Sequence, residues 1–167
     1  MRYNAVTIKD LARELGVSTS TVSRALRDSH EINPETKKLV LECAKRMNYH
    51  PNPIALSLKE QKSRSIGVVV SEIANSFFSQ AINGMESVAQ KRGYNVIITQ
   101  TQESYRKELR ILEYLASRSI DGLLISISTE TQDTSHFAQL HARGLPLVFF
   151  DRVTGDINTH TVVADNF

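Results

Sequence analysis

The stretch T-I-K-D-L-A-R-E-L-G-V-S-T-S-T-V-S-R-A-L, residues 7–26, predicts two short helices separated by one tight turn. Thr7 and Asp10 have the spacing of a capping box at the start of the first helix. Gly16 supplies the left-handed residue on which helices commonly end. One apolar stripe with helical spacing comprises Ile8, Leu11, Ala12 and Leu15.

The second predicted helix has a small buried face and a polar exposed face. Ser18 is its expected N-cap. Its buried face needs only Val22, Ala25 and Leu26, and its other face carries Thr19, Ser20, Ser23 and Arg24. Small hydroxyl groups and one arginine are the chemistry with which a helix reads base edges in a major groove. Taken alone, the stretch fits an ordinary helical hairpin with a solvated polar face equally well.

A third helix is predicted after Asn33, which serves as a cap before a proline at the first helical position. Its apolar face comprises Leu39, Val40, Cys43, Ala44 and Met47. We interpret Cys43 as a small core residue rather than a reactive thiol. Three helices that share one core predict a compact helix-turn-helix domain at residues 5–50.

Residues 51–64 are predicted to form a hinge helix and a charged linker. Two prolines keep the chain extended until Asn52, which can cap a short helix that ends at Leu58. So short a helix is unstable alone in water, because nucleation outweighs the few hydrogen bonds gained. We therefore expect the segment to become ordered only when a partner contacts it.

From Ser65 the pattern changes to short apolar strands that alternate with amphipathic helices. This alternation predicts an α/β fold, a parallel sheet with helices on both faces, at residues 65–167. The strands are expected at residues 65–70, 94–99, 122–127, 147–150 and 161–164, and the later helices at residues 104–119 and 134–143.

Composition places the chain among globular proteins. Of 167 residues 41% are hydrophobic and 23% are charged, and Cys43 is the only cysteine, so an internal disulfide is impossible. No apolar run has the length of a membrane span, and the first residues lack a secretory pattern. We therefore expect a cytoplasmic protein.

Charge is distributed unevenly along the chain. Residues 1–64 carry 12 Lys and Arg against 7 Asp and Glu, a net of +5, whereas residues 65–167 carry 8 against 11, a net of −3. A basic head on a mildly acidic body suits a module that binds a polyanion. So small a difference is also compatible with random surface charge.

A ligand site is predicted beyond the carboxyl ends of the strands, where open parallel sheets bind their ligands. The candidate side chains there are Phe77, Phe78, Ser126, Asp151 and Arg152. Aromatic faces with hydrogen-bonding groups suit a small polar ring such as a sugar. Two plainer interpretations stay open, namely that Phe78 is partly core and that Asp151 pairs with Arg152.

Catalysis has little support in the sequence. The turn after the first strand has no glycine-rich phosphate loop, no nucleophile elbow occurs, and the five histidines lack metal-ligand spacing. We expect no enzyme activity, no cofactor and no metal.

Seven motifs resemble the lactose-repressor family of bacterial transcription regulators, and the resemblance runs from Val6 to Phe167. They are V-T-I-K-D-L-A, V-S-x-x-T-V-S-R-A-L, N-Y-x-P-N, S-I-G-V-V-V, N-S-F-F-S-Q-A-I-N-G-M-E, D-G-L-L-I and F-D-R. The resemblance implies a homodimer on double-stranded operator DNA, a repressor located in the bacterial cytoplasm at the nucleoid, and a small-molecule effector such as a sugar or sugar phosphate.

The resemblance also implies residue roles. Thr19, Ser20 and Arg24 match the base-reading positions, and Leu58 matches the lever that wedges into the minor groove. The complete expected DNA-binding set is Thr7, Ser18, Thr19, Ser20, Thr21, Ser23, Arg24, Asn33, Tyr49, Asn52 and Leu58. Phe77, Phe78, Asp151 and Arg152 match the ligand-facing positions, and Ser126 joins the expected effector-binding set because it lies at a strand end.

The chain departs from the family in two respects. Leu56 stands where the family commonly has a polar or basic residue. Family members also have two lobes with the ligand between them, and residues 65–167 resemble the first lobe alone, so either the chain is a fragment or half the pocket is absent. A small-molecule binding protein of the periplasmic type is the alternative function, and a flavodoxin-like enzyme is a weaker one.

Overall fold

The computed structural model describes residues 5–52, 57 and 62–164, and the chain divides into two compact units, Met1–Leu56 and Ser57–Phe167. We call the first unit the head and the second the lobe. Most of the expected hinge, with Leu58, lies outside the described residues. No helix in the described part of the chain is long and apolar enough to cross a membrane.

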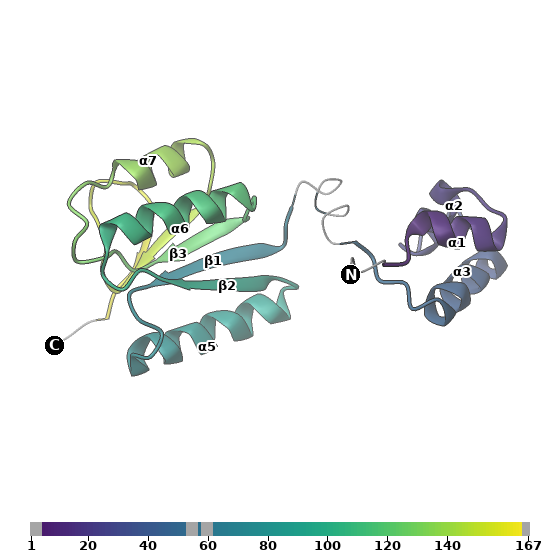
Figure 1. Ribbon diagram of the computed structural model, residues 1–167, viewed down its shortest axis with the longest axis horizontal. Helices are drawn as coiled ribbons and strands as arrows, with labels where there is room; N and C mark the ends of the chain where they lie inside the picture. The colour runs from purple at the N-terminus through teal and green to yellow at the C-terminus, as the bar shows by residue number, and fades with distance from the viewer. Residues whose placement is uncertain (1–4, 53–56, 58–61, 165–167) are drawn as a thin grey trace. The chain divides into compact units, whose positions relative to one another are not determined.

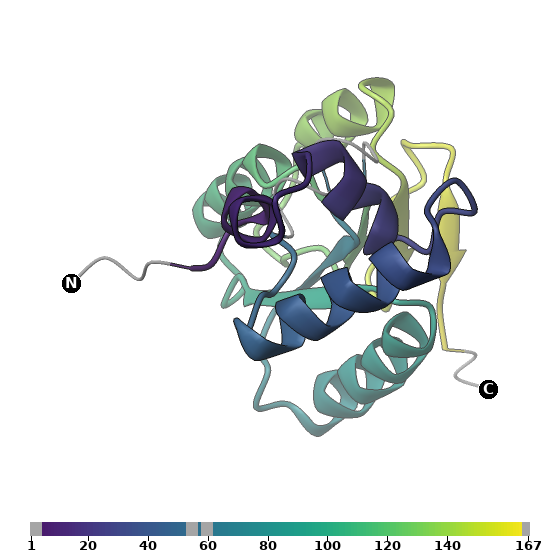
Figure 2. The same ribbon diagram turned by 90° about the vertical axis from the view of Figure 1, so that its right-hand side faces the viewer.

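The described residues of the head form three helices, α1 (Ile8–Leu15), α2 (Thr19–Ala25) and α3 (Pro34–Arg46). Figure 2 shows α3 crossing α1 and α2. Their shared core comprises Leu11, Ala12, Val22, Ala25, Val40, Cys43 and Ala44, all buried. The predicted helix-turn-helix arrangement is confirmed, and Cys43 is a core residue as expected.

Local caps explain where the first two helices begin and end. Both the backbone N–H and the hydroxyl of Thr7 donate to the Asp10 carboxylate, at 2.9 and 2.7 Å. Gly16 has φ 64°, a left-handed conformation that a residue with a Cβ adopts at a cost. Ser18 Oγ accepts from the Thr21 N–H at 3.1 Å and starts α2. The tight turn is thus encoded locally.

The third helix has the predicted cap but a narrower buried face than predicted. Asn33 Oδ1 accepts from the Glu35 N–H at 2.8 Å, and Pro34 is the first helical residue. Leu39, expected in the core, is 57% exposed. Leu39 lies with Lys38 on the outer side of α3, because Val40 and Cys43 are the residues that pack against α1 and α2.

The lobe is built on one five-stranded parallel sheet, as predicted, with the order β2-β1-β3-β4-β5. The strands are β1 (Ser65–Val70), β2 (Asn95–Gln100), β3 (Gly122–Ile125), β4 (Leu147–Phe150) and β5 (His160–Val162). The predicted third strand is two residues too long. Beyond Ile125 the Ile127 N–H bonds to the Arg152 carbonyl at 3.3 Å, in the loop after β4.

Helices cover both faces of the sheet (Figure 1). Helix α5 (Ser76–Lys91) lies on one face, and α6 (Tyr105–Ser117) and α7 (Ser135–Ala142) lie on the other. Each face has its own apolar core: Phe78 and Ile82 pack on the α5 side, and Leu112, Leu115 and Phe137 pack on the α6 and α7 side. The three central strands β1, β3 and β4 are therefore almost entirely apolar, as a sheet covered on both faces requires.

Candidate nucleic-acid interface and ligand site

The exposed face of α2 carries the predicted base-reading side chains. Thr19, Ser20 and Arg24 are all exposed, while Val22 and Ala25 on the opposite face are buried in the head. Helical spacing therefore brings the three polar side chains to one surface. The three side chains are therefore accessible to a DNA groove, and the apolar side of α2 packs on the core of the head.

Hydroxyl groups at the start of α2 bond to one another. Ser18 Oγ lies 2.7 Å from Ser20 Oγ and 2.8 Å from Thr21 Oγ1. Hydroxyls both donate and accept, so this cluster can exchange partners with water or with nucleic acid. The bonds orient the three hydroxyl groups, and each hydroxyl can still bond to a further partner.

Two arginine contacts near α2 were not anticipated. Arg24 Nη1 lies 3.3 Å from Glu31 Oε2, in a pair whose side chains are 54% and 55% exposed. Arg27 donates to the carbonyl and hydroxyl of Ser23, at 3.0 and 2.7 Å. Ser23 therefore accepts from Arg27, and Arg24 has an exposed acidic partner in Glu31. Sequence spacing of seven does not reveal the Glu31 contact, because a loop connects the two residues.

The remaining predicted DNA-binding residues have diverse surroundings. The side chains of Thr7 and Asn33 are engaged as helix caps. Tyr49 packs partly against the head core, where burial raises the pKa of its phenol, and Asn52 is exposed. Leu58 lies outside the described residues. No single surface is therefore established for all eleven residues.

The carboxyl edge of the sheet holds the predicted ligand site. Asp151 directly follows β4 with φ 61°, a conformation rare for a residue with a Cβ. Ser126, which follows β3, donates its hydroxyl to Asp151 Oδ2 at 3.0 Å. Ser126 is fully buried and supports Asp151 through this bond, and its contact with a ligand stays a prediction.

Arg152 is held by a carboxylate that the sequence analysis did not identify. Its Nη1 and Nη2 atoms each lie 2.5 Å from an oxygen of Glu103, whereas its Nε lies 3.8 Å from Asp151. Bonding to Arg152, with a further bond from the Thr129 N–H, lowers the pKa of Glu103 to about 2 although burial opposes this. The expected Asp151–Arg152 contact exists, but Glu103 is the closer partner.

Phe77 and Phe78 differ in exposure. Phe77 is 45% exposed, whereas Phe78 is 3% exposed and packs edge-on against Phe150 under α5. The ring of Phe78 packs into the core on the α5 side of the sheet, and its contact with a ligand stays a prediction. The alternative interpretation of Phe78 as a core residue is the one supported.

A buried carboxylate fixes the loop after β3. Glu108, in α6, is fully buried and accepts from the Ser128 N–H at 2.9 Å and the Thr131 hydroxyl at 2.8 Å. His136 Nε2 lies 3.1 Å from the same carboxylate. Burial alone would raise the pKa of Glu108, but these hydrogen bonds together lower it. Among the described residues no cluster of His, Cys, Asp and Glu could hold a metal ion.

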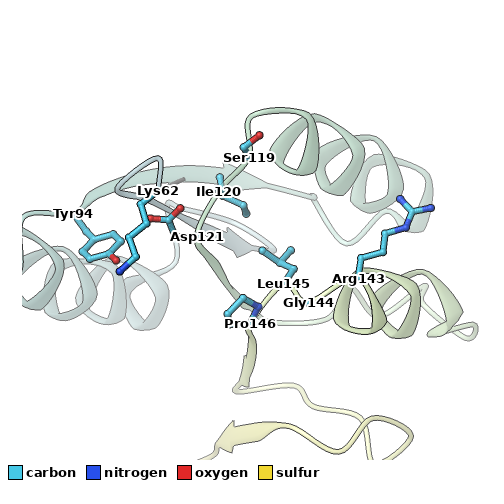
Figure 3. Close-up of a pocket in the computed structure, with 9 residues that line it drawn as sticks. All are labelled: Lys62, Tyr94, Ser119, Ile120, Asp121, Arg143, Gly144, Leu145 and Pro146. Atoms are coloured by element: carbon cyan, nitrogen blue, oxygen red, sulfur yellow. The ribbon is translucent and has the colours of Figure 1, made fainter. Parts of the chain in front are cut away.

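Two hollows in the lobe lie away from the carboxyl edge. One, of about 480 Å³, lies at the amino end of the sheet and is lined by Lys62, Tyr94, Ser119, Ile120, Asp121, Arg143, Gly144, Leu145 and Pro146. In Figure 3, Asp121 lies beside Lys62 and Tyr94, and Arg143 extends away from them. The polar groups do not converge on one point. A second hollow, of about 370 Å³, lies between α6 and α7.

The residues that sequence reasoning missed have weak local signals. Glu103 comes only three residues after β2 ends, so it could have been included in the carboxyl edge. Glu108 lies in α6, a helix with many charged residues, so the sequence predicts that its side chain is exposed to solvent. Its burial depends on Ser128 and His136, which approach from other elements.

Both parts of the chain match known protein families. The pattern of bacterial regulatory proteins of the lacI family matches residues 7–52, and that of a periplasmic binding protein domain matches residues 66–167. The HTH-type transcriptional repressor PurR of Vibrio cholerae is 37% identical over 145 residues, which are 87% of this chain and 43% of that protein. The chain thus spans less than half the length of this curated relative.

Solved structures agree with both matches. The lac repressor dimer bound to operator and the anti-inducer ONPF has a TM-score of 0.80 at 25% identity, over 96% of this chain and 48% of that one. A periplasmic binding protein/LacI transcriptional regulator from Alkaliphilus metalliredigens, complexed with D-xylulofuranose, has a TM-score of 0.54 at 30% identity, over 62% of this chain and 36% of that one. The chain therefore belongs to the lacI family of bacterial regulatory proteins, with a helix-turn-helix head and a periplasmic-binding-protein domain.

Proposed function

We propose that this protein is a sequence-specific DNA-binding transcriptional regulator, a repressor that responds to an effector. The observation that carries the proposal is the exposed polar face of α2, with Thr19, Ser20 and Arg24 on one surface of a capped helix. The match to the lacI family over residues 7–52 supports it. A helix of this kind fits the major groove and presents its side chains to base edges.

Arg24 is the side chain to which we assign base reading, through guanine O6 and N7. In the free head it contacts Glu31 in a pair that is more than half exposed. Exposed ion pairs contribute little free energy, so the exchange of Glu31 for a guanine costs little. Thr19 and Ser20 supply shorter hydrogen-bonding groups beside it.

We infer that the working form is a homodimer on a two-fold symmetric operator. The lac repressor relative was solved as a dimer bound to operator. Two copies of α2 would then read two half-sites, and the hinge segments, with Leu58, would meet at the centre. We assign the protein to the bacterial cytoplasm, associated with the nucleoid, because its proposed ligand is chromosomal DNA.

The effector that fits the carboxyl edge best is a polyhydroxyl compound, a sugar or sugar phosphate. Asp151 is oriented by Ser126 and exposes a carboxylate that accepts hydrogen bonds from hydroxyls, and Phe77 offers an aromatic face. Arg152 is already paired with Glu103, which favours neutral hydroxyls over a free anion at this point. The Alkaliphilus relative in complex with D-xylulofuranose supports this class of ligand.

A binding protein of the periplasmic type remains the second candidate for the lobe alone. It is not favoured, because it gives no role to the head, which matches the lacI family. A relative that matches 87% of the chain, head and lobe together, is named a transcriptional repressor.

Selection of bound sequences from random DNA by the 167-residue chain tests the proposal. We expect one enriched, symmetric site whose affinity exceeds that of a shuffled duplex about 10³-fold or more at one fixed salt concentration. The shuffled duplex has the same length and composition, so it controls for phosphate contacts. Equal affinity for the two duplexes would contradict the proposal.

A further inference from the structure

The carboxylate of Asp121 fastens the end of the linker to the lobe. Asp121, the residue before β3, accepts three hydrogen bonds from two linker residues. Its Oδ1 accepts from the N–H and the hydroxyl of Ser63, at 2.8 and 3.2 Å, and its Oδ2 accepts from the Arg64 N–H at 2.9 Å. Figure 3 shows Asp121 next to Lys62, the residue that precedes Ser63.

The backbone at this point is held from both sides. The Arg64 carbonyl accepts from the Asn95 N–H at the start of β2, and the Ser65 carbonyl accepts from the Asp121 N–H, each at 2.8 Å. Arg64 itself has φ 52°, which an L-residue rarely adopts. Such a conformation persists where the surroundings impose it. Asp121 supplies two of the bonds that impose it: its carboxylate accepts from the Arg64 N–H, and its own N–H donates to the Ser65 carbonyl.

We propose that Asp121 is a positioning residue for operator binding, because it fixes the point at which the linker leaves the lobe. The inference rests on the proposed function. Only four residues, 59–62, separate the expected hinge at residues 52–58 from Ser63, the first residue that Asp121 holds. Loss of the Asp121 carboxylate would release Ser63, and the tether would lengthen to five residues, because the Arg64 carbonyl stays bonded to the Asn95 N–H.

A longer tether weakens operator binding in two ways. The effective concentration of the hinge and head near their DNA sites falls as the free linker grows. The released residue, Ser63, also loses backbone freedom whenever the complex forms. Phosphate contacts by the head alone do not depend on the tether, so binding to random DNA is unaffected.

The graded variants Asp121→Asn and Asp121→Ala test the inference in the 167-residue chain. An asparagine retains one acceptor oxygen and an alanine retains none. We expect operator affinity to fall about three- to tenfold, more for alanine than for asparagine. Affinity for shuffled DNA should not change. Asp156→Asn is the matched control, since Asp156 is an exposed lobe carboxylate that accepts from Thr134 and Thr154.

Amide hydrogen exchange in the absence of DNA gives a second readout. The amides of Ser63 and Arg64 should be protected in the wild type and in Asp156→Asn, and should exchange faster in the Asp121 variants, while the thermal midpoint of the lobe stays within a few degrees. Unchanged operator affinity, or an equal loss on operator and shuffled DNA, overturns the inference.

The two proposals fail differently. A wild-type chain that does not discriminate its selected site from shuffled DNA contradicts the proposed function, and with it the positioning of a hinge on an operator. A wild-type chain that discriminates, with Asp121 variants that discriminate equally well, overturns the role of Asp121 alone.

Discussion

At the scale of single residues, the head and the lobe each contain an arginine that is paired with a glutamate, and the strength of the pair decides how readily the arginine can bind a ligand. Arg24 contacts Glu31 across a loop, with both side chains more than half exposed. Arg152 is gripped by both oxygens of Glu103. The first pair is easily exchanged for a ligand, and the second is a fixed part of the site.

Replacement of Arg24 by alanine should weaken binding to the selected operator by about 1–3 kcal/mol and relax the preference at one base position. The reason is the loss of a bidentate contact to guanine. Fluorescence anisotropy with the operator and its single-base variants measures both effects. Arg110→Ala, which removes one exposed positive charge from α6, is the control. An equal loss on operator and shuffled DNA would make Arg24 a phosphate contact only.

Replacement of Glu103 by glutamine should lower the stability of the lobe at pH 7 by about 1 kcal/mol, a value that discounts the pKa shift for partial exposure. The pKa of Glu103 is lowered from 4.5 to about 2 by Arg152, so its contribution is present above about pH 4.5. It is lost as the pH falls towards 2. Thermal unfolding of both proteins across this range should show the difference narrowing. A difference that does not depend on pH would contradict the role of the ion pair.

At the scale of elements, β3 connects the two sites of the lobe. It begins after Asp121, which holds the linker, and ends before Ser126, which supports Asp151. Four residues separate these positions, and both neighbours of β3 are strands of the same sheet. The linker contact and the ligand site therefore belong to one rigid element.

The hinge is the element on which specificity is expected to depend most. Leu58→Ala should weaken operator binding far more than binding to shuffled DNA, because the leucine is expected to insert at a flexible base step and support a bend. Specific DNA should also slow amide exchange across residues 52–58. Leu41→Ala, at an exposed leucine of α3, is the matched control. Protected amides in the free chain, or unchanged operator affinity, would leave the segment as a plain linker.

At the scale of the whole molecule, the lobe supplies one wall of the proposed ligand site. Phe77, Asp151 and Arg152 lie at an open edge, and neither of the two hollows described above includes them. Tight small-molecule sites usually enclose most of the ligand surface. This chain alone is therefore expected to bind effector weakly.

A thermal-shift screen of the 167-residue chain with sugars and purines should find no strong stabiliser. A ligand present at a hundredfold excess over its dissociation constant would add about 2.7 kcal/mol of stability, a shift that is readily measured. Asp151→Asn serves as the control for any compound that does shift the midpoint. A large shift that this variant abolishes would show that one wall suffices.

The sequence by itself determined the features that local chemistry encodes. Periodicity and caps located α1 and α2, since Thr7, Gly16 and Ser18 act on neighbours within a few residues. The alternation of apolar strands and helices likewise predicted the parallel sheet. Strand ends were less certain, because β3 stops where its pairing with β1 and β4 ends.

Tertiary structure decided what depends on residues far apart in the chain. Glu103 meets Arg152 across 49 positions, and Asp121 meets Ser63 across 58, so no local pattern announces either contact. Burial was also decided by packing. Phe77 and Phe78 are adjacent and identical in the sequence, and only the orientation of α5 on the sheet makes one a surface residue and the other core.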